Sequence, residues 1–178
     1  MIALTYPFSG SYGVSNPYGA PSDRYVRGYH PGVDFAMPEG TPVYAAAPGA
    51  VTFTGDAGAY GGLVTVSHGG GVETLYAHLS RFAVFADREQ PQVATGTLLG
   101  YSGNTGLSTG PHLHFEAREN GEPVDPTPYL SVGNNLPGGT PTLPPGTPPE
   151  QPGVAPVPFP VPVLAVAALV VIGLVILK

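Results

Sequence analysis

The chain has no cysteine and no tryptophan, and lysine and arginine together supply only 6 of its 178 residues. Without cysteine, disulfide bonds and thiolate metal sites are excluded, so a metal ion would have to be held by histidine and carboxylate groups. The 12 acidic residues leave a formal net charge of −6. This charge argues against nucleic acid as a partner, because affinity for phosphates rests on lysine and arginine.

Glycine and proline are plentiful, with 26 and 23 residues, but they are concentrated in one part of the chain. They make up more than half of residues 133–160 and about a quarter of the first 132 residues. This composition predicts a domain over residues 1–132, which is large enough to bury a core, and a linker over residues 133–160. The prolines of the linker favour an extended polyproline II conformation.

Residues 161–177 are apolar and uncharged, and Lys178 follows them. As a helix this segment would extend about 25 Å, close to the roughly 30 Å of a bilayer's hydrocarbon core. A buried core helix is the alternative, but the segment is apolar on every face and follows a proline-rich spacer. We therefore predict a C-terminal transmembrane helix over residues 161–177, with a lipid membrane as its partner.

Short runs of β-branched and aromatic residues recur in the first 132 residues, with glycine or proline between them. This pattern predicts a mainly β fold built on an antiparallel sheet, with residues 68–71 as the turn of a hairpin. The first ten residues are expected to supply the first strand. Further strands are expected at Val43–Ala47, Ala50–Thr54, Leu63–Ser67, Val72–Ala77, Thr97–Tyr101 and His112–Arg118.

Four of the five histidines fall in three short segments. His30 precedes Asp34 by four residues, but Pro31 and Gly32 exclude a regular helix there, so a turn has to bring the two side chains together. His78 lies at the end of a predicted strand.

The third segment, PHLHFE, places two histidines side by side. Strand alternation puts His112, His114 and Glu116 on one face and the intervening apolar residues on the other, toward the core. Imidazole and carboxylate together are ligands that zinc takes, and a catalytic zinc has three protein ligands and one open position. Residue types and spacing leave open which three groups bind the metal and which two remain for chemistry.

The segments YHPGVDFA, TPVYAA, YAHLS and GYSGNTG followed by GPHLHFE occur in this order, and together they resemble the lysostaphin/LytM-type zinc endopeptidases of peptidoglycan. The resemblance implies a peptidoglycan endopeptidase with a zinc-containing groove and peptidoglycan peptides as its substrate. It implies three ligands for Zn²⁺ and two catalytic residues: His30, Asp34 and His114 bind the metal, and His78 and His112 act in catalysis. None of these residues is missing, unlike in the non-catalytic members of that family.

Other residues near these motifs have two interpretations. His68 lies in the glycine-rich turn and is expected to have a structural role there. Glu116 either hydrogen-bonds a metal ligand or occupies a solvated strand position. Tyr25 and Tyr29 precede the first histidine motif and either line the groove or pack within the domain.

The first ten residues contain no lysine or arginine and reach Pro7 early, unlike a secretory signal peptide. Because peptidoglycan lies outside the cytoplasmic membrane, we expect a virion-associated, bacteriolytic enzyme of a membrane-containing bacteriophage. It would be anchored in the virion membrane, beside other virion proteins, and would act on the host cell wall during entry or lysis. Two alternatives stay open: a bacterial envelope-anchored endopeptidase that remodels the cell wall, and a non-catalytic wall-binding or structural virion module.

Overall fold

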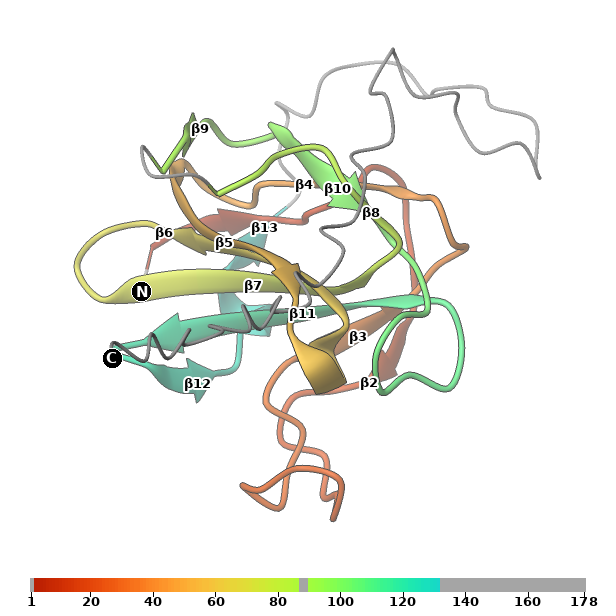
Figure 1. Cartoon of the computed structure of the whole chain (residues 1–178). Helices are drawn as coiled ribbons and strands as arrows, with labels where there is room; N and C mark the ends of the chain where they lie inside the picture. Colours follow the sequence, from red (N-terminus) through yellow and green to blue (C-terminus); the bar gives the residue numbers. More distant parts are fainter. Residues whose placement is uncertain (1, 87–89, 132–178) are drawn as a thin grey trace, which may run out of the picture. The chain divides into compact units, whose positions relative to one another are not determined.

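The computed structural model describes residues 2–86 and 90–131, which form a mainly β domain (Figure 1). Its strands are β1 (Leu4–Thr5), β2 (Val14–Asn16), β3 (Val33–Ala36), β4 (Pro42–Tyr44), β5 (Gly49–Asp56), β6 (Gly62–Ser67), β7 (Val72–Leu79), β8 (Arg81–Phe82), β9 (Gln92–Val93), β10 (Leu98–Tyr101), β11 (His112–Glu119), β12 (Glu122–Val124) and β13 (Leu130–Ser131). Two short 3-10 turns, η1 (Gly58–Tyr60) and η2 (Thr127–Tyr129), are the helical elements of these residues. None of the described helices could span a membrane. The predicted linker (133–160) and transmembrane helix (161–177) lie outside the described residues.

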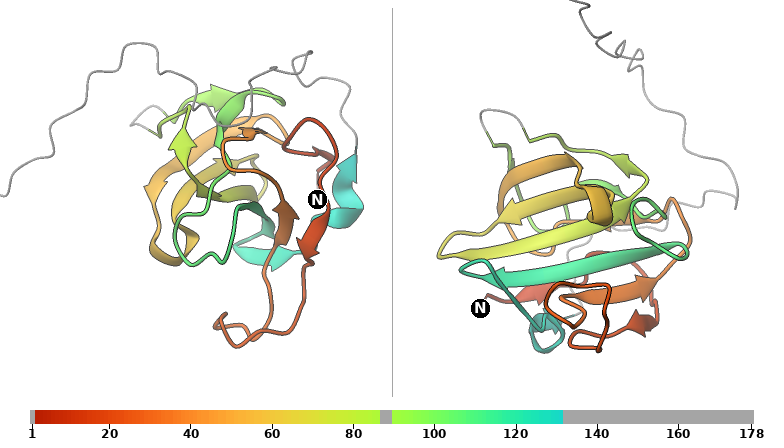
Figure 2. Two further views of the ribbon diagram at one scale, coloured as in Figure 1. Left: turned by 90° about the vertical axis from the view of Figure 1, so that its right-hand side faces the viewer. Right: turned by 60° about the horizontal axis from the view of Figure 1, so that its bottom comes forward.

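Most strands join one antiparallel sheet, in the order β2-β3-β11-β7-β6-β5-β9, and β12 pairs with β11. The long strands β7 and β11 lie side by side within it (Figure 2). A smaller antiparallel sheet has the order β4-β10-β8, and β1 pairs in parallel with β13. The predicted antiparallel fold is therefore confirmed, with one parallel pair between strands from opposite ends of the domain.

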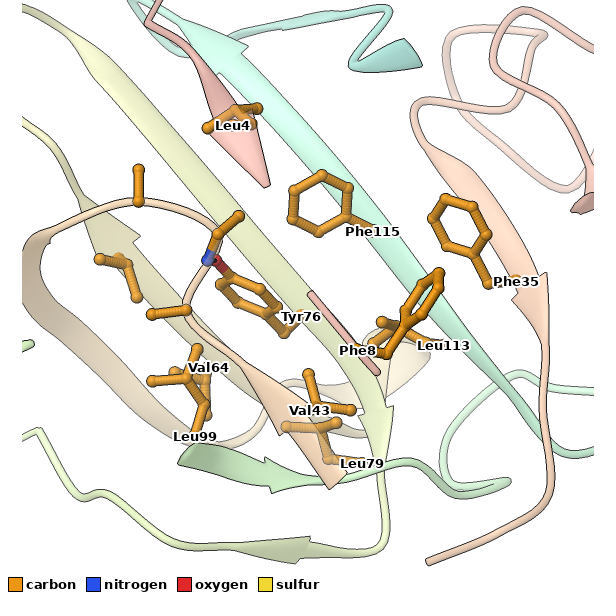
Figure 3. Close-up of a cluster of buried hydrophobic side chains, with 14 of the residues drawn as sticks. Leu4, Phe8, Phe35, Val43, Val64, Tyr76, Leu79, Leu99, Leu113 and Phe115 are labelled. Atoms are coloured by element: carbon orange, nitrogen blue, oxygen red, sulfur yellow. Dashed lines mark hydrogen bonds between the residues drawn. The ribbon is translucent and has the colours of Figure 1, made fainter. Parts of the chain in front are cut away.

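The hydrophobic core joins the large sheet to the small one (Figure 3). Leu113 and Phe115 of β11 and Tyr76 of β7 are buried against Val43 of β4 and Leu99 of β10. Fully burying an aliphatic or phenyl side chain of this size stabilises the fold by about 1.5–3 kcal/mol. Because alternate residues of β11 enter this core, the residues between them face the opposite side of the sheet, as predicted.

The six strands expected inside the domain are all present, with ends that shift by a few residues. The hairpin is also confirmed, since His68 donates from its main-chain nitrogen to the Val72 oxygen at 2.9 Å and β6 pairs with β7. The first ten residues supply β1, which is only two residues long. The sequence did not predict β3, because Pro31 and Gly32 suggested a turn throughout. The turn ends at Val33, where strand pairing with β11 begins.

Candidate metal centre and catalytic groove

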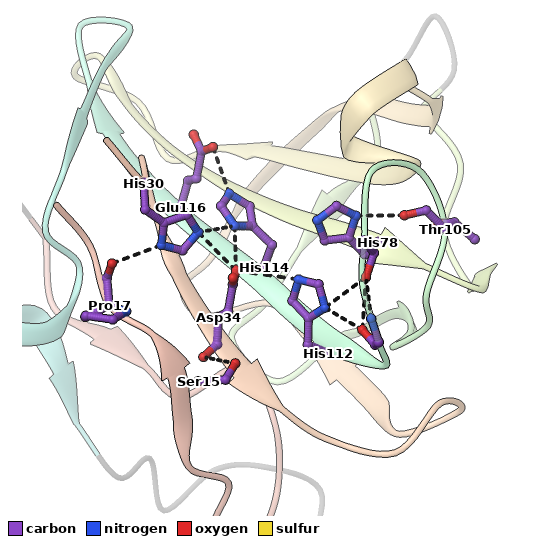
Figure 4. A network of polar contacts seen from close by, with 11 residues as sticks. Ser15, Pro17, His30, Asp34, His78, Thr105, His112, His114 and Glu116 are labelled. Carbon is purple, nitrogen blue, oxygen red and sulfur yellow. Dashed lines mark hydrogen bonds and ion pairs between the residues drawn. The ribbon is translucent and has the colours of Figure 1, made fainter. Parts of the chain in front are cut away.

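His30, Asp34 and His114 meet on the side of the sheet away from the core (Figure 4). Asp34 of β3 and His114 of β11 are direct partners in the antiparallel register, and His30 lies just before β3. The Oδ1 atom of Asp34 lies 2.8 Å from His114 Nδ1 and 3.1 Å from His30 Nε2, and the two nitrogens are 3.0 Å apart. Strand pairing and one turn thus bring the three predicted ligands together.

Gly32 makes this turn possible because β11 passes directly beside it. A Cβ atom at Gly32 would lie 2.5 Å from the main-chain oxygen of Phe115 and 2.9 Å from Cε1 of His114. Any side chain there would push His30 away from β11. The glycine of the motif is therefore required for close approach of two main chains.

The tautomers of the two histidines follow from their outer hydrogen bonds. His30 Nδ1 donates to the Pro17 oxygen at 3.0 Å, and His114 Nε2 donates to Glu116 Oε1 at 2.9 Å. Both oxygens can only accept, because one is a carbonyl and the other an ionised carboxylate. In each neutral ring the other nitrogen therefore carries a lone pair, and both lone pairs point toward Asp34.

Glu116 is buried, and its hydrogen-bonding role is confirmed. The Tyr60 hydroxyl donates to its Oε1 at 2.7 Å, and Arg118 Nε donates to its Oε2 at 2.8 Å. Burial alone would raise the pKa of Glu116, but His114, Tyr60 and Arg118 hold this pKa below its usual value. The alternative of a solvated strand position is wrong, because three side chains enclose the carboxylate.

A zinc ion fits this set of donor atoms. Two imidazole nitrogens and one carboxylate oxygen are ligands that zinc takes, and three protein ligands leave a fourth position open. Zinc bonds of about 2.0–2.1 Å in tetrahedral geometry would place neighbouring ligand atoms about 3.3 Å apart. The separations of 2.8, 3.0 and 3.1 Å are close to this value. Each histidine is also oriented by an outer hydrogen bond, as metal-binding histidines commonly are.

Charge within the cluster favours a cation. Burial raises the pKa of the Asp34 carboxyl, but hydrogen bonds from His114 and His30 outweigh burial and hold this pKa well below its usual range. Burial lowers the pKa of His114, whereas the carboxylates of Asp34 and Glu116 raise it, to about 8 overall. This raised pKa puts a proton on His114 Nδ1, in place of its lone pair, in metal-free protein near neutral pH, and a metal ion has to displace that proton.

A bulge in β7 turns His78 toward this cluster. Two residues of β7, one of them His78, stand opposite a single residue of β6, and His78 has a φ of 60°, in the left-handed region. Tyr76 and Leu79 both lie in the core although they are three positions apart. The extra residue reverses the alternation between them, so His78 points away from the core. An L-residue in this conformation stores strain, which is common at functional sites.

His78 and His112 flank the group formed by His30, Asp34 and His114, and each ring is held by a similar hydrogen bond. His78 Nδ1 donates to the Thr105 oxygen at 2.8 Å, and His112 Nδ1 donates to the Gly110 oxygen at 2.8 Å. Each neutral ring therefore keeps its lone pair on Nε2. The two ring centroids are 4.6 Å apart, and His112 Nε2 lies 3.6 Å from Asp34 Oδ1. Burial lowers the pKa of His78 to about 4, which keeps this ring neutral at pH 7.

Two cavities adjoin the cluster, so the site lies in a groove. One, of about 290 Å³, is lined in part by His114, Tyr60 and Arg118, and the other, of about 450 Å³, by Asp34 and His112. The two cavities share Arg24, Tyr25, His78 and Leu107. Tyr25 thus lines the groove, with its ring 5.4 Å from that of His30. Tyr29 instead packs on Tyr18 at 5.8 Å.

The fifth histidine, His68, has both ring nitrogens engaged. Nδ1 lies 2.7 Å from the Pro48 oxygen, and Nε2 lies 2.8 Å from Thr74 Oγ1. No ring nitrogen is left for a metal or a proton transfer, which confirms the structural role. The sequence reasoning missed Tyr60 and Arg118, the two residues around Glu116. Alternation along β11 could have placed Arg118 on the same face as Glu116, whereas no local sequence pattern pointed to Tyr60.

Residues 28–126 match peptidase family M23. The DD-carboxypeptidase/endopeptidase Mpg of Neisseria meningitidis serogroup B is 49% identical over 115 residues, which cover 64% of this chain and 26% of that protein. The peptidoglycan DD-endopeptidase ShyA of Vibrio cholerae is 45% identical over 96 residues, which cover 54% of this chain and 22% of that protein. The chain therefore spans about a quarter of the length of these relatives.

A solved structure with a similar fold is the catalytic domain of the antimicrobial peptidase lysostaphin from Staphylococcus simulans. It superimposes with a TM-score of 0.60 at 34% sequence identity, over 66% of this chain and 91% of that domain. The likeness thus covers nearly the whole of the lysostaphin domain, and it agrees with the family expected from the sequence motifs.

Proposed function

The chain belongs to peptidase family M23, whose members are zinc metallopeptidases, and on this premise we propose that it cleaves stem or cross-bridge peptide bonds of peptidoglycan. Relatives named for DD-endopeptidase activity, one of them on peptidoglycan, support this substrate. The observation that carries the proposal is the arrangement of the histidines. Two of them offer lone pairs beside Asp34, and two more flank that cluster inside a groove.

His30, Asp34 and His114 are the residues that would hold zinc. When bound, zinc supplies Lewis acidity, which activates water and polarises the carbonyl of the scissile bond. The three side chains need no large movement, because strand pairing and outer hydrogen bonds already orient them. This preorganisation favours one geometry of the reacting groups.

His78 and His112 would handle the protons of the reaction. A main-chain oxygen holds the Nδ1 proton of each ring, so in the neutral form the Nε2 atom carries the lone pair that can accept a proton from water. The protonated ring can then give that proton to the leaving amine. Because the two rings are 4.6 Å apart, one can act as base while the other, when its Nε2 carries a proton, donates to the developing oxyanion.

Digestion of purified peptidoglycan tests this proposal. The full-length, zinc-loaded protein is expected to release new amino termini, and a chelator is expected to stop the release until zinc is added back. Mass spectrometry of the products identifies the bond. A zinc-loaded protein that binds peptidoglycan of every wall type offered, but releases no amino termini, would contradict the enzyme and favour a non-catalytic wall-binding module.

We also propose that residues 161–177 anchor the enzyme to a membrane, on the basis of their uncharged apolar sequence, with residues 133–160 as the tether. The membrane of a bacteriophage virion stays our prediction for the location, with the bacterial envelope as the alternative. Quantitative mass spectrometry of purified virions and of host envelopes separates the two. Release of the protein by carbonate washing, which strips peripheral proteins, would contradict the anchor.

A further inference from the structure

The few arginines of this acidic chain are unevenly placed. Of the four in the described residues, Arg24, Arg27 and Arg118 line the same cavity, the one of about 290 Å³ that His114 also lines. The fourth, Arg81, lies on β8, where its guanidinium stacks 4.0 Å above the ring of Tyr101. Three of the four described arginines thus lie beside the candidate metal centre.

The two cavities of the groove differ in chemistry. The arginine-lined cavity has no aspartate or glutamate among its described lining residues. The other cavity is lined mainly by hydroxyl, amide and main-chain groups, and it contains the Asp34 carboxylate. Besides Arg24, Tyr25, His78 and His112, its other polar lining residues are Ser15, Asn16, Ser22, Ser108 and Thr109. Three arginines thus line the cavity on one side of the candidate metal centre, whereas on the other side Arg24 and the Asp34 carboxylate stand among hydroxyl and amide side chains.

Two of the three arginines are already paired. Arg118 Nη2 lies 2.7 Å from Glu116 Oε2, and Arg27 Nη1 lies 2.6 Å from Glu122 Oε2. The side chain of Arg24 makes no hydrogen bond or ion pair with the residues that the structure describes. Arg24 also borders both cavities. It is therefore the cation whose charge is free to meet a ligand beside the reacting bond.

We propose that the arginine-lined cavity binds a free carboxylate of the peptide substrate, and that Arg24 is its principal partner. This inference rests on the proposed peptidase function and adds that a charged group on one side of the cleaved bond is recognised. A guanidinium binds a carboxylate through two parallel hydrogen bonds, a pairing that an amide cannot reproduce. The half-buried Arg118 lines the same cavity, where Glu116 and Tyr60 hold its guanidinium in place.

Matched peptides test the carboxylate site. A cross-linked peptide that spans the bond identified by digestion is prepared in three forms: with free carboxylates, with those N-terminal to the bond amidated, and with those C-terminal to it amidated. Amidation on one side of the bond is expected to lower kcat/KM about tenfold, which is the usual contribution of one charge-assisted pair. Amidation on the other side should have little effect. In Arg24→Gln the free-carboxylate form is expected to fall to the rate of the sensitive amide.

Arg81→Gln is the control, because it removes the same charge outside the groove and should keep the tenfold preference. Arg24→Lys should keep part of it, since the charge remains but the paired hydrogen bonds do not. Equal cleavage of all three peptides by the wild-type enzyme would overturn the carboxylate site while leaving the peptidase function intact. A preference that persists in Arg24→Gln would overturn the role of Arg24. Cleavage of no peptide by the zinc-loaded wild type would contradict the proposed function itself and the inference with it.

Discussion

The two pairs of histidines in the groove are anchored alike but face different surroundings. All four rings donate one N–H to an oxygen that only accepts, which leaves the second nitrogen for chemistry. The inner nitrogens of His30 and His114 lie 3.1 and 2.8 Å from Asp34 Oδ1, whereas Nε2 of His112 lies farther from that oxygen, at 3.6 Å. This difference supports the proposal that the first pair holds a cation and that the second pair moves protons.

Burial follows the same division. His30 is 0% exposed and His114 2%, whereas His78 is 7% exposed and the side chain of His112 14%. A metal ligand benefits from exclusion of water, while a base has to reach water and substrate. His68, with both nitrogens engaged, shows the third possibility, a histidine used only for structure.

The largest expected effect comes from removing one member of the metal-holding pair, which consists of His30 and His114. His114→Ala removes one of three ligands and leaves Asp34 without its nearest partner. We expect zinc and activity to be lost together. Zinc content by mass spectrometry and amine release from peptidoglycan measure the two quantities on the same sample, and activity without zinc would contradict the prediction.

Removing one member of the proton-handling pair, which consists of His78 and His112, should leave the metal in place. We expect His112→Ala and His78→Ala to lower kcat by about 10²–10⁴, the usual contribution of general acid–base catalysis, while each variant binds one zinc per chain. Steady-state kinetics on a defined peptide measures the loss. If both variants kept wild-type kcat, the assignment of protons to this pair would be wrong.

A smaller effect is expected from changing Glu116, the carboxylate that hydrogen-bonds His114. Glu116→Gln keeps the shape of the side chain but removes the charge that orients His114. We expect zinc affinity to fall about 10–100-fold, as for other residues that hydrogen-bond a metal ligand. Competition with a fluorescent chelator gives the affinity. Excess zinc should restore most of the activity, which it would not do for a catalytic residue.

Zinc binding should also depend on pH through His114. Metal-free protein holds a proton there below pH about 8, and zinc has to displace it. The apparent Kd for zinc is therefore expected to rise by about tenfold for each pH unit below 8, and this proton makes no contribution above 8. Calorimetry in buffers with different ionisation heats counts the released protons. A Kd that does not change between pH 6 and 8 would show that His114 is neutral throughout.

The smallest effect should come from the structural histidine. His68→Gln loses part of the hydrogen bonding to Pro48 and Thr74 and is expected to lower the free energy of unfolding by about 1 kcal/mol. Zinc content and kcat/KM should equal those of the wild type. A loss of zinc in this well-folded variant would place His68 in the metal site.

Much of the site could be predicted from the sequence because its pattern is local. Alternation along β11 assigns His114 to one face and Phe115 to the other without knowledge of the rest of the fold. The burial of Glu116 could not be predicted in this way. It depends on Tyr60, which is 56 positions away in the sequence and reaches the carboxylate from η1.

The orientation of His78 was likewise beyond local pattern. A strand over Val72–Ala77 was expected to end before this residue, but β7 continues to Leu79 through the bulge. Only the pairing with β6 shows that one residue is extra, and this pairing joins residues on both sides of a hairpin. Long-range pairing, rather than propensity, therefore decides which way the histidine points.

Zinc content measured side by side in four alanine variants tests the central claim most directly. The proposed roles of the histidines predict that His30→Ala and His114→Ala lose more zinc affinity than the 10–100-fold expected for a residue that only hydrogen-bonds a ligand. At a free zinc concentration that just saturates the wild type, both variants should therefore be nearly free of zinc. The same roles predict that His78→Ala and His112→Ala bind one zinc ion each. Loss of zinc in either of the second pair, or its retention in either of the first pair, would contradict the assignment.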